Sequence, residues 1–135
     1  MSYTVADIQY VDRTLLKQWI HQGGRDSLGR RVQVVDVRGH DHIGGHIIGS
    51  VNMPSHSFGE RMGELEQRLD ADGVDVVVFH CAQSQQRGPA AALKFMRHCD
   101  GRFDVKVLSG GFDEWQSHYG KDPALTEGYV PDLWE

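Results

Sequence analysis

Short stretches of consecutive apolar residues recur along the chain. The two longest, residues 32–38 and 74–79, are dominated by valine, and residues 104–108 form a third. The first two are too continuously apolar for half-exposed strands and are typical of buried strands in a parallel sheet. We therefore predict strands at these three segments. Shorter extended pieces are expected at residues 8–11, as an edge strand, and at residues 50–54.

Helical periodicity occupies the segments between these strands. Asp12 stands where an N-cap is expected before residues 14–20, and further helices are predicted at residues 57–69, 88–98 and 112–119. The first helix is expected to pack on the sheet through one apolar face, which comprises Leu15, Leu16, Trp19 and Ile20. Strands that alternate with helices predict an α/β fold with a central, mostly parallel sheet flanked by helices.

Two segments fall outside this alternation. Residues 39–49 are expected to form a loop with one helical turn at most. The last segment, residues 120–135, is too apolar for a free tail, and we expect it to pack back on the body. Its apolar residues are Leu125, Tyr129, Val130, Leu133 and Trp134.

Size and charge narrow the function classes. The chain has 135 residues, which suits one domain spanning 1–135, and its net charge is −5. That charge argues against general binding to nucleic acid or to an anionic membrane. We find no apolar run long enough to cross a bilayer and no signal peptide pattern. The two cysteines, Cys81 and Cys99, do not resemble a disulfide framework, so a reducing compartment, cytoplasmic or also nuclear, is the simplest expectation.

The candidate chemistry lies between the strand at 74–79 and the helix at 88–98. His80 and Cys81 end the strand, and Arg87 follows at the expected start of the helix. The short loop between them can turn its N–H groups around one small volume. That volume has a positive electrostatic potential, which comes from those groups, the helix N-terminus and Arg87. The loop that would bind an oxyanion comprises Ala82, Gln83, Ser84, Gln85 and Gln86.

This setting favours a nucleophilic role for Cys81. A helix N-terminus and a nearby guanidinium favour the thiolate, which can attack phosphorus, arsenic or sulfane sulfur. The planar guanidinium of Arg87 can hold two oxygens of a tetrahedral oxyanion at once. The alternative for a lone cysteine is an inert buried residue. The combination of His80, Cys81 and Arg87 in a strand–loop–helix setting favours catalysis.

Three histidines, His40, His42 and His46, lie close together in the loop at 39–49. They suggest a metal site at first sight. No cysteine and no helical i,i+4 pair completes a ligand set, and Asp41 alone adds little. We expect these histidines to make loop hydrogen bonds, and we predict no metal and no tightly bound cofactor.

Three segments together resemble the rhodanese family. Residues 34–38, with Gly45-His46-Ile47 and Ser50-Val51-Asn52-Met53-Pro54, look like its first signature, and residues 108–115 look like its closing signature. The stretch from His80-Cys81 to Arg87-Gly88-Pro89 is similar to the active loop of two branches of that family. These are the M-phase inducer (dual-specificity) phosphatases and the eukaryotic arsenate/antimonate reductases. The resemblance implies a three-layer rhodanese fold, a catalytic Cys81 and an oxyanion-binding Arg87.

Loop length and composition refine this resemblance. Sulfur-transferring rhodaneses typically have one residue fewer between cysteine and arginine, so the loop here suggests a wider cradle for phosphate or arsenate. Other cysteine-dependent tyrosine phosphatases place a glycine where Ser84 stands and a hydroxyl residue where Gly88 stands. The M-phase inducer group also has glycine at the second place. What helps Cys81 depart in the second step is left open, with Ser84 as a candidate.

The resemblance leaves several activities open. A phosphatase would form a cysteinyl-phosphate on Cys81 from a phosphate ester or a phosphoprotein. An arsenate or antimonate reductase would use the same first attack and then need glutathione, with glutaredoxin as a further partner. The alternatives are a persulfide sulfurtransferase and a non-catalytic binding module; modules of that kind usually lose the cysteine.

Two supporting roles are also open. Asp36 lies at a neighbouring strand end, where we expect it to bond loop backbone or an arginine rather than to act as general acid. Asp41 and Glu60 are further candidates for that acid, and otherwise the substrate brings its own proton. Cys99 should lie roughly 15 Å from the loop along the helix, at 1.5 Å per residue, which argues against a resolving role.

Overall fold

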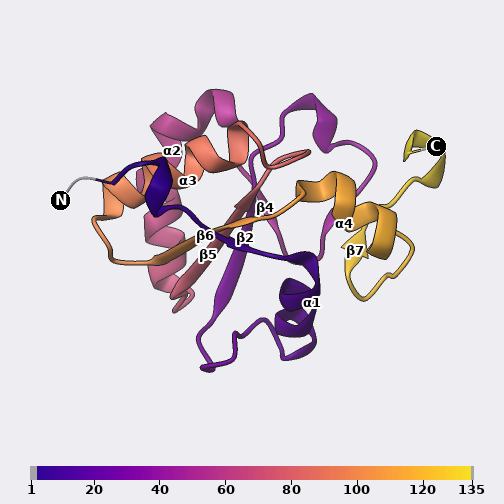
Figure 1. The fold of residues 1–135 in the computed structure, drawn as a ribbon, viewed down its shortest axis with the longest axis horizontal. Coiled ribbons are helices and arrows are strands. Elements are labelled where there is room, and N and C mark those ends of the chain that lie inside the picture. Colours follow the sequence, from indigo (N-terminus) through magenta and orange to yellow (C-terminus); the bar gives the residue numbers. More distant parts are fainter. Residues whose placement is uncertain (1–2, 135) are drawn as a thin grey trace.

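The computed structural model describes residues 3–134. Its main sheet, at the centre of Figure 1, has five parallel strands in the order β1-β6-β5-β2-β4. The strands are β1 (Gln9–Val11), β2 (Val32–Asp36), β4 (Val51–Asn52), β5 (Val76–His80) and β6 (Asp104–Leu108). The three predicted long strands are the three central ones, and residues 9–11 lie at an edge as expected.

Four helices cover the two faces of this sheet. They are α1 (Arg13–His21), α2 (Ser55–Ala71), α3 (Arg87–Cys99) and α4 (Gly111–Tyr119). Helices α2 and α3 lie on one face, and α1 and α4 lie on the other (Figure 1). The α/β fold predicted from the alternation is confirmed. Within residues 3–134, no helix is long and apolar enough to cross a membrane.

Strand β5 shows why its sequence is apolar throughout. All five of its residues are buried, because successive side chains point to opposite faces and helices cover both faces. Val77 and Phe79 pack in the core under α2 and α3, whereas Val76 and Val78 pack in the core under α1 and α4. Phe58 of α2 and Phe95 of α3 make edge contacts with Phe79, with ring centroids 5.5 and 5.7 Å apart.

The boundaries of the elements differ from the prediction in small ways. The central strand begins at Val76 rather than Val74 and includes His80. Strand β2 ends at Asp36, two residues before the predicted end, because Arg38 turns inward to bond the Asp36 carboxylate. Leu15, predicted on the packed face of α1, is 37 % exposed, while Leu16 and Trp19 are buried. The Asp12 cap is confirmed: its Oδ1 accepts the Leu15 N–H at 2.8 Å.

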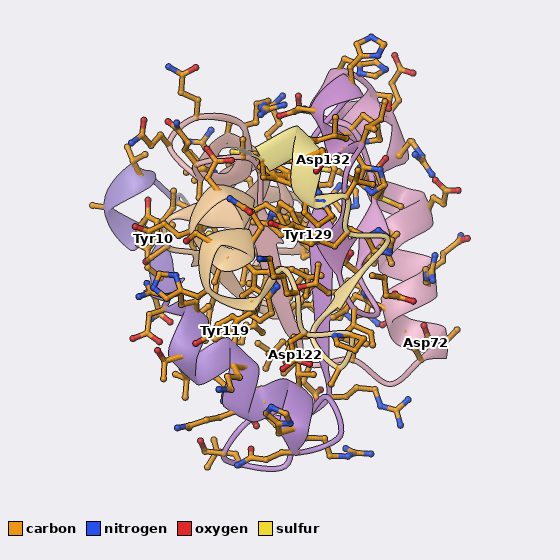
Figure 2. All side chains as sticks on the ribbon, turned by 90° about the vertical axis from the view of Figure 1, so that its right-hand side faces the viewer. Tyr10, Asp72, Tyr119, Asp122, Tyr129 and Asp132 are labelled. Carbon is orange, nitrogen blue, oxygen red and sulfur yellow. The ribbon has the colours of Figure 1, made fainter. Side chains whose placement is uncertain are left out.

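The C-terminal tail packs back on the body, as predicted, although two of its apolar residues, Val130 and Leu133, are 44 % and 58 % exposed. Figure 2 shows it running from Asp122 through Tyr129 to Asp132. A two-residue strand, β7 (Thr126–Glu127), pairs antiparallel with β3 (His46–Ile47), a pair that the sequence did not predict. Leu125 is fully buried, and the Trp134 indole donates to the Gly44 carbonyl at 3.0 Å. Short 3-10 turns, η1 (Val5–Asp7), η2 (His40–His42) and η3 (Pro131–Trp134), complete the fold.

Candidate active site

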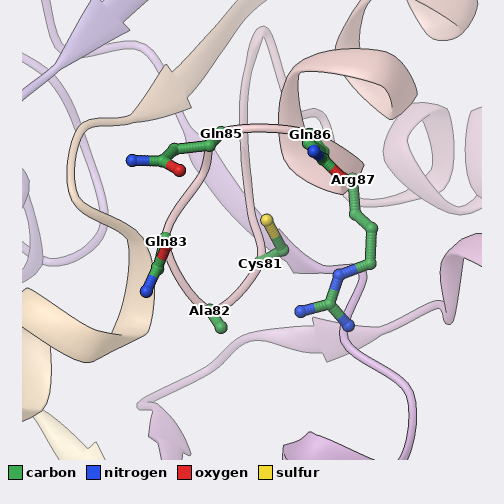
Figure 3. Close-up of a pocket in the computed structure, with 6 residues that line it drawn as sticks. All are labelled: Cys81, Ala82, Gln83, Gln85, Gln86 and Arg87. Atoms are coloured by element: carbon green, nitrogen blue, oxygen red, sulfur yellow. The ribbon is translucent and has the colours of Figure 1, made fainter.

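The loop from Cys81 to Gln86 connects the end of β5 to the start of α3. It surrounds a cavity of about 270 Å³ lined by Cys81, Ala82, Gln83, Gln85, Gln86 and Arg87, shown in Figure 3. The position agrees with the rule that ligands of parallel α/β sheets bind beyond the carboxyl ends of the strands. The structure therefore brings Cys81 and Arg87 to one small opening at the N-terminus of a helix.

The sulfur of Cys81 lies against the first turn of α3. Its side chain is only 3 % exposed, and its Sγ accepts the Gly88 N–H at 3.3 Å. A Cβ on residue 88 would come within 3.3 Å of the Cys81 nitrogen, so glycine allows the loop and helix to pack this closely. A helix N-terminus supplies unpaired N–H groups and a positive partial charge, both of which attract an anion beside the sulfur.

Helix α4 holds the loop from its other side. The N–H groups of Phe112 and Asp113 donate to the carbonyls of Cys81 and Ala82, at 3.0 and 2.8 Å. Gly111 has φ of 59°, and a Cβ there would lie 2.5 Å from the Ala82 oxygen. Any other residue would push α4 off the loop. This contact requires glycine at position 111, whereas Gly110 has φ of 77° and a Cβ there would clash with the Glu114 carboxylate.

His80 supports the loop from inside the sheet. Its ring is fully buried, and Nδ1 lies 3.0 Å from the Cys81 carbonyl oxygen, to which it donates. Burial lowers the pKa of His80, so the ring is neutral at neutral pH. Its Nε2 lies 3.8 Å from the Asp36 carboxylate. His80 therefore fixes the backbone next to the sulfur and does not line the cavity.

Asp36 has the structural role expected for it. It is fully buried and accepts hydrogen bonds from the guanidinium of Arg38, the shortest at 2.7 Å. Burial acts to raise the pKa of Asp36, but the hydrogen bonds and charge of its neighbours, Arg38 among them, hold it below its usual value. Arg38 in turn donates to the carbonyls of Asp41 and Gly45. This buried pair ties the loop after β2 to the sheet.

Arg87 makes a bidentate ion pair that the sequence did not predict. Its Nη1 and Nη2 donate to the two carboxylate oxygens of Asp41, at 2.9 and 2.7 Å. This arginine lowers the pKa of Asp41, so the carboxyl group is ionised at neutral pH. In this geometry Asp41 is the ion-pair partner of Arg87, a placement that argues against the role of general acid suggested for it. Glu60, the other candidate, is exposed on α2 and does not line the cavity.

Ser84 is placed differently from its neighbours in the loop. Its backbone is left-handed, with φ of 56°, and its side chain is buried without a hydrogen-bond partner for Oγ among the described residues. It is the one loop residue between Cys81 and Arg87 that does not line the cavity. The hydroxyl is therefore not placed to help Cys81 depart, and the left-handed backbone stands at the position that was compared above with a glycine of other tyrosine phosphatases.

The histidines of the loop at 39–49 are spread over separate contacts. His42 and His46 stack with ring centroids 5.5 Å apart, and His46 lies 3.4 Å from a Glu127 oxygen. Within residues 3–134, no group of three or more histidine, cysteine or acidic side chains is arranged to hold a metal ion.

Cys99 lies at the far end of α3 from the loop. It is half-buried, and burial followed by the charge of Glu66 raises its pKa to about 12. The helix between the two cysteines is 13 residues long, so they are separated by roughly 18 Å at 1.5 Å per residue. Cys99 therefore stays protonated at neutral pH and lies far from Cys81.

Sequence reasoning missed two residues that shape the site. Asp41 is the partner of Arg87, and Gly111 lets α4 pack against the loop. Asp41 is 46 positions from Arg87, and only the fold brings them together. The glycine pair before Phe112 was visible, but its contact with the loop was not.

Comparison with known proteins places this geometry in a family. The rhodanese-like domain family matches residues 13–118. The CDC25-like phosphatase YCH1 of Saccharomyces cerevisiae is 42 % identical, over 98 % of each chain.

Solved structures of other proteins also resemble this chain. The structure of Ygr203w, described as a yeast protein tyrosine phosphatase of the rhodanese family, has a TM-score of 0.89 at 42 % identity, covering 99 % of this chain and all of that one. The As-Sb reductase from Leishmania major has a TM-score of 0.76 at 31 % identity, covering 89 % of this chain and 85 % of that one. The resemblance inferred from three motifs is confirmed, and the chain belongs to the rhodanese family.

Proposed function

We propose that this chain is an enzyme in which the Cys81 thiolate attacks tetrahedral oxyanions. The observation that carries the proposal is that Cys81 and Arg87 line one cavity at the N-terminus of α3. Arg87 and the loop from Ala82 to Gln86 bind the oxyanion, and His80 and Asp36 support them from inside the fold. The relatives named as phosphatases support this function.

In the phosphatase reaction, the Cys81 sulfur forms a bond to phosphorus while the bond from phosphorus to the ester oxygen breaks. Arg87 and the helix N-terminus stabilise the charge on the equatorial oxygens. Water then attacks phosphorus, inorganic phosphate leaves, and the thiolate is restored.

The absence of an acid at the cavity limits the substrates. Among the described residues, those that line the cavity carry no carboxyl group. The leaving oxygen must therefore depart with little help or receive a proton from the substrate. We propose a strong preference for aryl phosphates over alkyl phosphates.

Arsenate reduction is the second candidate, supported by the similarity to the Leishmania As-Sb reductase. Cys81 attacks arsenic, and one oxygen leaves as water. Glutathione then adds to arsenic with loss of a second water. When the two sulfurs join as a disulfide, their electron pair reduces arsenic from the pentavalent to the trivalent state. A second glutathione, or glutaredoxin, restores Cys81. Antimonate follows the same course.

One preparation assayed in parallel distinguishes these functions. It is supplied with an aryl phosphate, with arsenate plus glutathione, and with thiosulfate. Release of the phenol or formation of arsenite supports the proposal when Cys81→Ser abolishes it and Cys99→Ser does not. A persulfide on Cys81 detected by mass spectrometry, without either of the other products, would instead indicate a sulfurtransferase. No turnover of any of the three would indicate a binding module.

A further inference from the structure

Among the described residues, the guanidinium of Arg87 makes hydrogen bonds along one of its edges. Its two Nη atoms donate to the two Oδ atoms of Asp41, at 2.9 and 2.7 Å. A guanidinium has five N–H groups, and an end-on pair of this kind uses two of them. The Nε–H and one further Nη–H, which form the neighbouring edge, are left for another anion.

The free edge faces the sulfur. Figure 3 shows the Nε side of the Arg87 guanidinium toward Cys81, with the outer Nη edge turned away from it. Arg87 and Cys81 line the same cavity. An anion seated above the sulfur would therefore meet Nε and one Nη, while the carboxylate of Asp41 occupies the opposite edge.

We propose that Asp41 is a positioning residue for Arg87, an inference that rests on the proposed oxyanion chemistry. Asp41 clamps the guanidinium end-on, so that its Nε edge is presented side-on to the oxyanion above Cys81. The Asp41 carboxylate and the oxyanion do not compete for Arg87, because each anion uses its own pair of N–H groups.

Asp41 is itself held by two further contacts. Its Oδ1 accepts the Gly39 N–H at 3.1 Å, and its backbone carbonyl accepts Nη1 of Arg38 at 3.0 Å. Arg38 is fully buried and is bonded to the buried carboxylate of Asp36. A rigid chain of contacts thus runs from the end of β2 to the arginine of the cavity.

The charge of Asp41 affects the ground state and the transition state differently. A carboxylate near the cavity repels a bound dianion, whereas a fixed guanidinium stabilises charge that develops during the attack. Removal of the carboxylate lessens the repulsion but frees the guanidinium to move. The two effects offset one another in ground-state binding, and the loss of orientation lowers kcat.

The variant Asp41→Asn tests this inference. The amide keeps the shape but offers one acceptor, and its NH₂ opposes Nη2 of Arg87. We expect kcat for an aryl phosphate to fall about tenfold or more, the worth of a hydrogen bond to a charged group, while the inhibition constant of inorganic phosphate changes less than about threefold. The variant Asp41→Glu, which restores a carboxylate, should recover a large part of kcat.

Asp70→Asn is the matched control. Asp70 pairs with Arg102, and its side chain is 41 % exposed, against 43 % for Asp41. That pair joins α2 to the loop between α3 and β6, away from the cavity, so kcat should stay within about twofold of the wild type.

A double variant shows whether Asp41 acts through Arg87. In the Arg87→Lys background, where the bidentate pair cannot form, adding Asp41→Asn should change the single-turnover rate less than about twofold. The same loss in both backgrounds would overturn the inference, and so would a higher kcat in Asp41→Asn, which would make Asp41 a competitor of the substrate.

Nuclear magnetic resonance of the Arg87 Nε–H separates this inference from the proposed function. Phosphate should shift that resonance in the wild type, and Asp41→Asn should broaden it or expose it to exchange. If phosphate shifts no Arg87 signal and no substrate turns over, the proposed function fails. If phosphate shifts the signal equally in the wild type and Asp41→Asn and kcat is unchanged, only the role of Asp41 fails.

Discussion

The two ends of α3 each carry a cysteine, and the two sulfurs have opposite surroundings. Cys81 precedes the N-terminus, where the Gly88 N–H points at its sulfur and Arg87 shares its cavity. Cys99 ends the helix, where burial and then the charges of Glu66 and Asp70 raise its pKa. A helix presents unpaired N–H groups at its start and unpaired carbonyls at its end, so the first position stabilises an anion and the second does not.

The comparison teaches that position on the helix, rather than residue type, decides the chemistry. Cys81 is more deeply buried than Cys99, but the loop around it directs N–H groups and a guanidinium at one small volume. At the other end of the helix, the charge of Arg102 does not outweigh burial and the acidic side chains of Glu66 and Asp70 on α2.

The largest expected effect is loss of the nucleophile. Cys81→Ser should lower the turnover of an aryl phosphate by at least about a thousandfold, because the hydroxyl is a far weaker nucleophile without a base. Cys99→Ser, the matched change at the other end, should leave turnover within about twofold. Steady-state assays of both purified variants measure this, and an equal loss in the two would break the comparison.

The next effect separates two arginines of the same helix. Arg87→Ala should lower kcat/KM roughly a hundredfold to a thousandfold, the range for removal of one group that stabilises an oxyanion in the transition state. Arg97 lies in the last turn and donates to the Tyr3 carbonyl, so Arg97→Ala should leave kcat/KM nearly unchanged. An unaffected rate in Arg87→Ala would show that Arg87 does not bind the oxyanion.

A smaller effect concerns stability at alkaline pH. The pKa of Cys99 is raised from 9.0 to about 12 in the folded chain, so folding keeps the thiol protonated where the unfolded chain ionises. Its contribution is fully present below pH 9.0 and is lost as the pH rises toward about 12.

At about pH 10, Cys99→Ser should remove about 1 kcal/mol of the pH-dependent loss in unfolding free energy. Urea titrations of the wild type and the variant, between neutral pH and about pH 10, measure the difference in slope. Parallel curves would show that Cys99 ionises as freely in the fold as in the unfolded chain.

The smallest effect sharpens the contrast between two helix starts. Asp12 caps α1 with its own side chain, whereas Gln86 before α3 makes no such bond and leaves that N-terminus open. Asp12→Ala should therefore lower the unfolding free energy by about 1 kcal/mol without changing kcat. Thermal unfolding measures the change in stability, and the aryl phosphate assay measures kcat. A changed kcat would show that the two helix starts are coupled.

The sequence predicted the three central strands, the four helices and the pairing of Cys81 with Arg87 at one loop. These features depend on local patterns, such as continuous valine runs and a cysteine at a strand end, that one segment carries by itself. The pairing of β3 with β7, and that of Arg87 with Asp41, join segments that are distant in the chain. No local pattern encodes such contacts, and each follows from where the loops after β2 and α4 are folded.

The nucleophile and the oxyanion-binding arginine of the candidate site were predictable, but the placement of the residues around them was predictable only in part. The role of Asp36 as the partner of an arginine was expected, because a buried carboxylate needs a partner. The placement of Ser84 was not, because its left-handed backbone turns its hydroxyl away from the cavity.

The most direct measurement is a crystal structure of the Cys81→Ser variant with phosphate. We predict one phosphate ion in the cavity above residue 81, bonded to Arg87 through Nε and one Nη, with N–H groups of the loop around its other oxygens. An empty cavity at phosphate concentrations that inhibit the wild type, or an ion bound with Arg87 turned away from it, would contradict the claim that sulfur and guanidinium share an oxyanion site.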